Sequence, residues 1–212
     1  MNDERYVPAA GHHALTRFYD PVMAATMRER TFRAALVREA VTAGPLTILD
    51  VGCGTGSQSI ALADAAPHAQ ITAVDGDPDA LARARARSAG RPIAWTDALA
   101  QDLPLEDDAM DCVTASLLLH HLSPSTRLLA LREMRRVLRP GGRLHIADWG
   151  RPQDPAMRLA FLAIRALDGR QNTADHAAGR IPQIIRDAGF TDVRTTGRLR
   201  TVLGTLELLE AT

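Results

Sequence analysis

Residues 46 to 148 alternate between two patterns of hydrophobic side chains. Short, mostly apolar runs are typical of strands buried on both faces, and apolar positions that recur every three or four residues are typical of helices. The runs that predict strands lie at 46–51, 70–74, 92–95, 111–116 and 143–148, and the segments that predict helices lie at 57–66, 77–89 and 124–138. Strands that alternate with helices in this way predict an α/β fold with a doubly wound parallel sheet.

The two ends of the chain depart from this alternation. Apolar residues at helical spacing from about 14 to 41 predict two helices, because Pro21 interrupts the pattern. After the fifth run, the pattern predicts helices at 155–167 and 181–188 and two strands within 193–209. A hairpin at this position adds an antiparallel edge to the parallel sheet.

Composition and charge narrow the class of protein. The chain has 212 residues, of which 46% are hydrophobic, and 25 basic side chains balance 25 acidic ones. This length favours a single domain, residues 1–212, and no repeat or linker divides it. We assign the N-terminal helices to 1–43, a core to 44–150, and the last helices and hairpin to 151–212. Zero net charge argues against nucleic acid as a partner.

Cysteine usage and hydropathy indicate the compartment. Cys53 and Cys112 are the only cysteines in the sequence, which excludes a disulfide scaffold. The chain begins with polar residues that lack the apolar segment of a signal peptide, and no apolar run reaches the roughly 18 residues that a membrane helix needs. We therefore expect a cytoplasmic protein without a membrane span.

The strongest chemical signal is a glycine-rich segment between the first predicted strand and the helix after it. Gly52, Gly54 and Gly56 follow Asp50 there, and Cys53 stands between the first two glycines. Glycine allows a sharp turn and the close approach of a ligand. The helix that follows offers free N–H groups and the positive end of its dipole. The segment therefore predicts a site for an anionic group, either a phosphate or a carboxylate.

Two residues favour the carboxylate. The dinucleotide fingerprint G-x-G-x-x-G has its third glycine where this chain has Ser57, and Gly56 comes one position early. Asp50 repels a pyrophosphate, but it accepts hydrogen bonds from an ammonium group, directly or through water. Both features favour a nucleoside with an amino acid end over NAD.

Acidic residues follow the next two predicted strands. Asp75 ends the second strand, where a carboxylate accepts from both ribose hydroxyls, although a turn with Gly76 is the alternative. Asp77 is expected to cap the helix that Pro78 begins. Asp97 follows the third strand, where its carboxylate is placed to accept from the exocyclic amine of an adenine.

These features together resemble the class I S-adenosylmethionine-dependent methyltransferases. The segments that carry the resemblance are the glycine motif at 49–56, the stretches 97–99 and 103–105 with Asp111, and the LRPGG turn within 138–144. The resemblance is closest from about 46 to 150. It implies a Rossmann-like, mostly parallel sheet of seven strands, S-adenosyl-L-methionine as cofactor, and methyl transfer to a small-molecule acceptor. It implies cofactor contacts at Asp50, Gly52, Cys53, Gly54, Gly56, Asp75, Gly76, Asp97, Ala98, Leu99, Ser116 and His121.

Within this family the chain most resembles the small, single-domain group that includes ubiquinone and menaquinone C-methyltransferases. Residues 17–20 resemble the N-terminal lid of that group, and 188–190 resemble its late helix-to-strand turn. The resemblance implies that the N-terminal helices form a lid in which Tyr19 contacts both cofactor and substrate. We expect a monomer or a homodimer. The acceptor atom stays open between carbon, oxygen and nitrogen.

Methyl transfer sets modest demands on catalytic residues. The leaving group is a neutral thioether, so positioning the acceptor in a site that excludes water does most of the work. A general base is needed only when the acceptor carries a proton. The candidates for a base or an orienting group lie near the carboxyl ends of strands and are His121, Asp148 and His176, with Trp149 as a wall of the substrate pocket. Capping or packing is the alternative role for each.

Other functions fit the sequence less well. The sequence has no CxxC or HxxxH spacing. Its paired histidines are adjacent, and adjacent residues on a helix do not face one direction, so we expect no metal site. A nucleic-acid methyltransferase that acts on amino groups would carry an Asn/Asp-Pro-Pro-aromatic turn after the fourth predicted strand, and this sequence lacks that turn. A reductase that uses NAD(P) is disfavoured by Ser57 and Asp50. A non-catalytic cofactor-binding domain stays open. The arginine-rich runs at 83–87 and 132–136 are predicted to be solvated helix faces.

Overall fold

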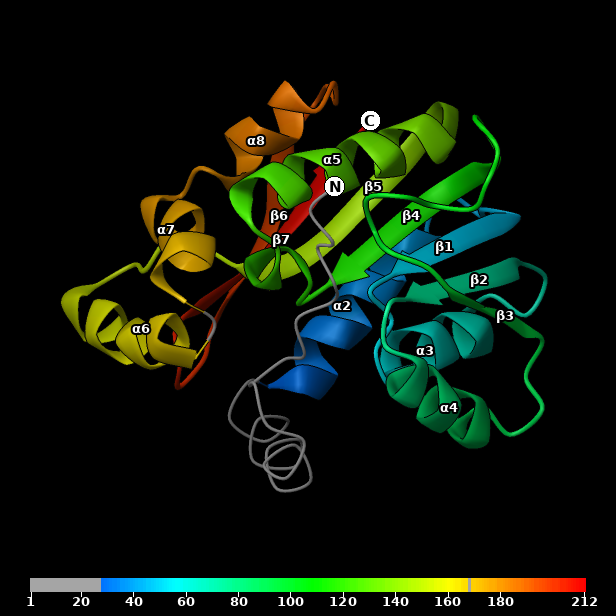
Figure 1. Cartoon of the computed structure of the whole chain (residues 1–212), viewed down its shortest axis with the longest axis horizontal. Helices are drawn as coiled ribbons and strands as arrows, with labels where there is room; N and C mark the ends of the chain where they lie inside the picture. The colour runs from blue at the N-terminus through cyan, green and yellow to red at the C-terminus, as the bar shows by residue number, and fades with distance from the viewer. Residues whose placement is uncertain (1–27, 168) are drawn as a thin grey trace, which may run out of the picture.

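A computed structural model describes residues 28–167 and 169–212, and a mixed sheet forms its centre (Figure 1). Within this part of the chain, seven strands lie in the order β3-β2-β1-β4-β5-β7-β6. Their bounds are β1 Thr47–Val51, β2 Gln70–Asp75, β3 Ile93–Asp97, β4 Met110–Ser116, β5 Leu138–Trp149, β6 Arg194–Arg200 and β7 Thr205–Ala211. The predicted α/β fold is confirmed, including the antiparallel hairpin, since β7 pairs antiparallel with both β5 and β6.

The parallel part of the sheet contains a point where the strand order reverses. β1 pairs in parallel with β2 on one side and with β4 on the other. The chain therefore winds outward from β1 in one direction and later from β4 in the opposite direction. In open α/β sheets the crevice at this point, beyond the carboxyl ends of the strands, is where ligands bind.

Helices cover both faces of the sheet (Figure 1). Their bounds are α2 Glu29–Val41, α3 Ser57–Ala65, α4 Pro78–Arg87, α5 Pro124–Val137, α6 Pro155–Leu167, α7 Arg170–Ala178 and α8 Ile181–Asp187. α2, α3, α4 and α6 pack on one face, and α5 and α8 pack on the other. α4 begins as predicted, because the Asp77 side chain accepts from the N–H groups of Asp79 and Ala80 and Pro78 follows it.

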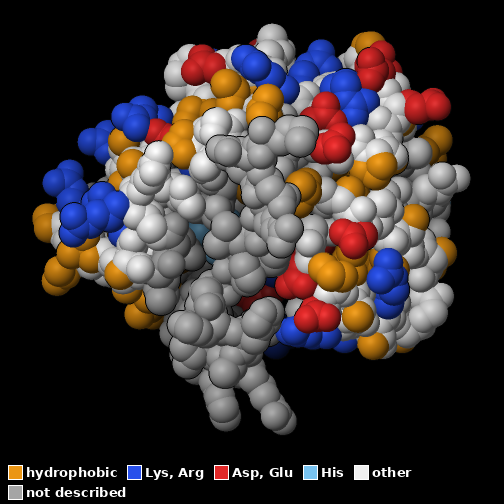
Figure 2. All heavy atoms as spheres, viewed as in Figure 1, with side chains coloured by type: hydrophobic (Ala, Val, Ile, Leu, Met, Phe, Trp, Pro, Cys, Tyr) orange, Lys and Arg blue, Asp and Glu red, His pale blue; other side chains and the backbone are white. Residues whose placement is uncertain are grey.

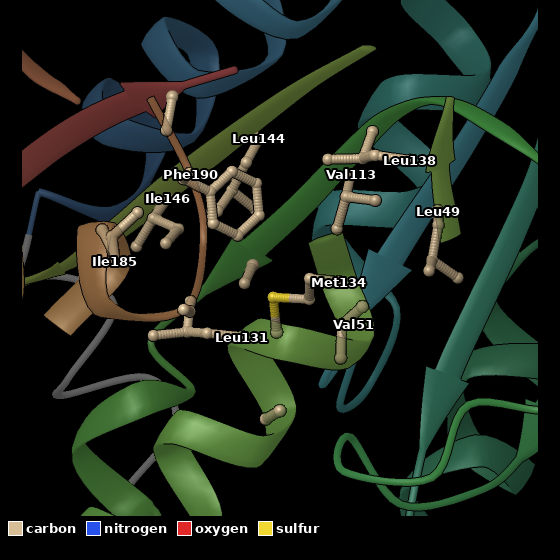
Figure 3. Packing of buried hydrophobic residues seen from close by; sticks show 14 of the residues in the cluster. Leu49, Val51, Val113, Leu131, Met134, Leu138, Leu144, Ile146, Ile185 and Phe190 are labelled. Carbon is tan, nitrogen blue, oxygen red and sulfur yellow. The ribbon is translucent and has the colours of Figure 1, made fainter. Parts of the chain in front are cut away.

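Alternate residues of the strands supply the two cores. Figure 3 shows the side under α5 and α8, where labelled apolar side chains of β1, β4 and β5 meet those of the two helices. The residues labelled there are Leu49, Val51, Val113, Leu131, Met134, Leu138, Leu144, Ile146, Ile185 and Phe190. Because both faces of the central strands are buried, these strands are nearly continuous apolar runs, as the sequence pattern indicated.

The structure differs from the sequence predictions in three places. β5 begins at Leu138 and not at residue 143, because the LRPGG segment continues from α5 directly into the strand, next to an irregular register with β4. The helix α7 and the 3₁₀ turn η1 (Leu119–His121) were not predicted, since neither has a clear apolar period. The helix predicted before Pro21 lies outside the described residues.

Candidate active site

Three carboxylates stand at neighbouring strand ends, as the sequence predicted. Asp75 and Asp97 are the last residues of β2 and β3 and are paired in register, and Asp50 lies one residue before the end of β1. All three therefore reach the carboxyl edge of the sheet near the strand-order reversal. Their surroundings differ, however, because Asp50 is fully buried, Asp75 is half-buried and Asp97 is exposed.

The glycine segment connects β1 to α3 through three left-handed residues. Gly52, Gly54 and Gly56 have φ values of +69°, +53° and +81°. A Cβ atom at Gly52 would lie 2.7 Å from Leu118, and one at Gly56 would lie 2.6 Å from Trp95, so both positions are closed by packing. A Cβ atom at Gly54 would meet nothing within 4 Å. Gly54 thus presents bare backbone to open space, which is what a closely approaching ligand requires.

Asp50 is a structural carboxylate. It is fully buried, and its two oxygens accept from the hydroxyls of Ser59 at 2.6 Å and Thr114 at 2.9 Å. Burial raises the pKa of Asp50 to about 6, although both hydroxyl donors and the positive charge of Arg33 oppose this. The sequence suggested that Asp50 accepts directly from a ligand ammonium group. Such an ammonium would have to compete with the two hydroxyl donors for the oxygens of Asp50.

Asp75 organises the glycine segment. Its carboxylate accepts from the N–H of Gly54 at 2.7 Å and from the N–H of Asp77 at 2.9 Å. Burial raises the pKa of Asp75 above its usual value, against the effect of these two N–H donors. The side chain stays half-buried, and each oxygen keeps a second lone pair for a ligand hydroxyl.

The remaining predicted cofactor residues line the same edge. Asp97 and Leu99 are exposed and Ala98 and Gly76 are half-buried, whereas Cys53 is buried. Ala98 also donates its N–H to the carbonyl of Asp75 at 3.2 Å, which ties the loop after β3 to β2. Burial raises the pKa of the Cys53 thiol, which suits a packing residue.

Two further residues at this edge were missed by the sequence reasoning. Arg33 of α2 reaches across to Ser116, with Nη1 3.4 Å from its Oγ, and to the Oε1 of Gln58 at 3.5 Å. Gln58 is buried at the start of α3, and its Nε2 has no hydrogen-bond partner among the described residues. A buried unpaired donor is costly, so this N–H group fits an anionic ligand group, and Arg33, which also pairs with Glu29, adds positive charge beside it. No local motif marks either residue.

A histidine of η1 and an aspartate near the carboxyl end of β5 form a buried pair. His120 Nδ1 donates to Asp148 Oδ1 at 2.7 Å, and the other oxygen of Asp148 accepts from the Leu119 N–H at 2.7 Å. Burial alone would raise the pKa of Asp148, but His120, His176 and the hydrogen bonds outweigh it and hold that pKa well below its usual range. The carboxylate is therefore ionised and orients the His120 ring.

His176 stands behind this pair. Its Nδ1 donates to the Trp149 carbonyl at 2.7 Å and lies 3.9 Å from Asp148. Burial lowers the pKa of His176 to about 4, so the ring is neutral near pH 7 and its buried Nε2 is an acceptor. Of the predicted catalytic residues, the structure thus places Asp148 and His176 together and adds His120.

The other predicted catalytic and pocket residues have different positions. His121 is exposed and its ring lies 4.0 Å from that of His120, centroid to centroid, so the two neighbours share one side of η1. Trp149 is buried against Phe161, within the core under α2 and α6. Tyr19 lies outside the described residues.

Two arginines from the predicted solvated helix faces also contact loops of the site. Arg87 of α4 donates to the carbonyl and the hydroxyl of Thr55, both at 2.8 Å, and so supports the glycine segment from outside. Arg136 of α5 donates to the carbonyls of Leu103 and Leu105. Both residues hold loops that carry site residues.

Two kinds of feature are absent from the described residues. Among them, no three His, Cys, Asp or Glu side chains gather as a metal site. Within the same ranges, no helix combines the length and the apolar character needed to cross a bilayer.

The chain is similar to known proteins over most of its length. Residues 48–142 match the protein family described as "Methyltransferase domain". A ubiquinone/menaquinone biosynthesis C-methyltransferase of Desulfotalea psychrophila is 30% identical over 184 residues, which are 78% of this chain and 74% of that protein. A demethylmenaquinone methyltransferase of Clavibacter sepedonicus is 34% identical over 134 residues, and the chain spans only 53% of its length.

A solved structure supports the fold. The N-methyltransferase NodS of Bradyrhizobium japonicum, in complex with S-adenosyl-L-homocysteine, has a TM-score of 0.67 and 18% identity, with 96% of this chain and 93% of that chain covered. At this identity the likeness concerns the fold, which is Rossmann-like.

Proposed function

The chain belongs to the class I S-adenosylmethionine-dependent methyltransferases, and from this premise we propose that it methylates a small molecule whose reacting atom carries a proton. The observation that carries the proposal is the buried His120–Asp148 pair beside the carboxyl edge of the sheet. A methyltransferase whose acceptor is already a strong nucleophile has no need of an oriented base.

The residues around the glycine segment fit the methyl donor. Asp75 would accept from the ribose hydroxyls, and the open backbone at Gly54 would allow close approach. Arg33 and the unpaired Nε2 of Gln58 would meet the carboxylate of the amino acid end. When bound, S-adenosyl-L-methionine supplies a methyl group on a positively charged sulfur.

The acceptor side is built around His120. Its Nδ1–H points at Asp148, so in the neutral ring Nε2 carries the lone pair that takes a proton from the acceptor. The ionised carboxylate of Asp148 stabilises the imidazolium that results, as in other aspartate–histidine pairs. His121, Asp148 and His176 stay our candidates for a base or an orienting group, and Trp149, which packs against Phe161, stays our candidate for the wall of the substrate pocket.

The relatives suggest which acceptors to test first. The two curated relatives are named for methylation in quinone biosynthesis. A hydroxylated aromatic ring of the quinol type carries acidic protons on oxygen and an activated ring carbon, so it suits a base of histidine strength. We propose this class of small molecule as the acceptor, with neither nucleic acid nor protein as substrate.

The proposal is tested by separating donor binding from turnover. Calorimetric titration with S-adenosyl-L-homocysteine should show binding by the wild type, at least tenfold weaker binding by Asp75→Ala, and unchanged binding by Asp64→Ala, a matched loss of an exposed carboxylate on α3. His120→Gln should keep binding but lose 10²- to 10⁴-fold in turnover of a quinol acceptor. Absence of binding by the wild type would overturn the methyl-donor site, and full turnover by His120→Gln would overturn the base.

A further inference from the structure

The helix α6 carries apolar residues on two opposite sides. Met157, Phe161 and Ile164 point inward and are buried against the core that contains Trp149. The opposite side carries Leu159 and Leu162, whose exposed fractions are 71% and 50%. A surface helix normally turns its apolar side to the core and a polar side to water, so the outward face of α6 lacks a partner within the described chain.

Ala163 and Ala166 complete this outward face, and both are exposed. With Leu159 and Leu162 they recur at spacings of three and four residues, which places all four on one side of the helix. We call Leu159, Leu162, Ala163 and Ala166 the α6 apolar face.

Arginines border this face on the side of α7. A groove of about 580 Å³ runs between α6 and α7 and is lined by Arg151, Arg158 and Arg165 together with Leu159, Phe161 and Leu162. At the left edge of Figure 2, arginine side chains lie next to hydrophobic ones in this region. A surface that is both apolar and basic differs from the charge-balanced remainder of the chain.

These arginines have no anionic partner among the described residues. No ion pair or side-chain hydrogen bond joins Arg151, Arg158 or Arg165 to another described residue, and the Nε of Arg165 is buried without an acceptor. Asp154, which precedes α6, pairs with Arg200 instead, and Glu207, which lies against Gly150, pairs with Arg198. Among the described residues the local charge is therefore positive, and a buried guanidinium N–H that lacks an acceptor there fits an anion.

We propose that the α6 apolar face docks on an anionic lipid bilayer. The leucines would enter the acyl region, and the arginines beside them would meet headgroup phosphates. A bilayer presents a negative layer directly above an apolar one, which matches the arrangement of charge and apolar area on α6. A second copy of the chain fits less well, because a twofold contact through α6 would bring the arginines of both copies together.

The test is vesicle co-sedimentation of the full chain. Vesicles of phosphatidylcholine with added phosphatidylglycerol should bind the protein, vesicles of phosphatidylcholine alone should not, and salt should weaken the binding. Loss of one arginine near the surface weakens binding about fivefold, so the double variant Arg158→Gln/Arg165→Gln should bind about 25-fold more weakly. Leu159→Ser/Leu162→Ser should bind at least tenfold more weakly.

Matched variants elsewhere separate this surface from general charge and apolar effects. Arg83→Gln/Arg132→Gln removes two exposed arginines from α4 and α5, and Leu129→Ser removes an exposed leucine from α5. Both should bind like the wild type. No binding of the wild type to anionic vesicles would overturn the proposal, as would equal losses in the matched variants. A wild-type dimer that Leu159→Ser/Leu162→Ser dissociates, without vesicle binding, would assign the face to a second copy. None of these outcomes depends on the proposed methyl transfer.

Discussion

At the residue scale, identical side chains at one sheet edge have different functions because their surroundings differ. Asp50 is fully buried between two hydroxyl donors, while Asp75 is half-buried and bonded to two backbone N–H groups. Only Asp75 keeps accessible lone pairs next to open space. Asp50 thus holds β1 to α3 and β4 through its two hydroxyl donors, and we propose that Asp75 is the acid that faces the ligand.

This difference predicts an unusual pH dependence for Asp50. Burial raises its pKa from the ordinary 3.8 to about 6 in the folded chain, so its contribution to the free energy of unfolding is largest below about pH 4 and is lost as pH rises through 6. Asp50→Asn removes this dependence. We expect the free energy of unfolding of the wild type, measured in urea, to exceed that of the variant by about 2–3 kcal/mol more at pH 4 than at pH 7.

Asp111 provides the opposite case as a control. Although burial alone would raise its pKa, the N–H groups of Leu46 and Thr47 and the Arg139 charge lower it. The difference between wild type and Asp111→Asn should therefore grow as pH rises. If this difference in the free energy of unfolding changed in the same direction with pH for both variants, burial would not raise the pKa of Asp50 as we infer.

At the element scale, α7 is attached to the site by one buried arginine. Arg127 of α5 is fully buried and donates from Nη1 to Asp175 of α7 at 2.7 Å and from Nε to the carbonyl of Leu119 in η1 at 2.9 Å. It thereby links three elements around His120 and His176. Arg180, which is exposed, also pairs with Asp175.

Substitution of the buried Arg127 should therefore lower the free energy of unfolding far more than substitution of the exposed Arg180. Arg127→Met removes the side-chain donor to three backbone carbonyls and to Asp175, and we expect a loss of about 3–5 kcal/mol in the free energy of unfolding. Arg180→Met should lose less than about 1 kcal/mol. Guanidinium unfolding measures both values, and similar losses in the two variants would contradict the role of Arg127.

At the scale of the whole molecule, the sheet is continuous across the donor and acceptor sides. β1 and β4, on the two sides of the strand-order reversal, are hydrogen-bonded along their length. The donor residues and the His120–Asp148 pair are thus attached to one sheet. This continuity supports our proposal that the chain is one domain.

The two tryptophans test this proposal from opposite halves of the sheet. Trp95 lies in β3 and Trp149 ends β5, four strands away in the sheet order. In Trp149→Phe and in Trp95→Phe, the remaining tryptophan's fluorescence should change at the same denaturant concentration as the far-ultraviolet circular dichroism of that variant. Separate transitions would show that the halves unfold independently.

The sequence alone determined the sheet, the glycine segment and the acids at the strand ends. Each of these depends on local rules: apolar runs become buried strands, glycines mark left-handed turns, and a residue that ends a parallel strand lies at the carboxyl edge. Tertiary structure decided the rest. Arg33, Gln58 and the choice of His120 beside Asp148 depend on contacts between elements far apart in the chain. No local pattern encodes which of two adjacent histidines faces a carboxylate 28 residues away, because packing of η1 against β5 and α7 sets that direction.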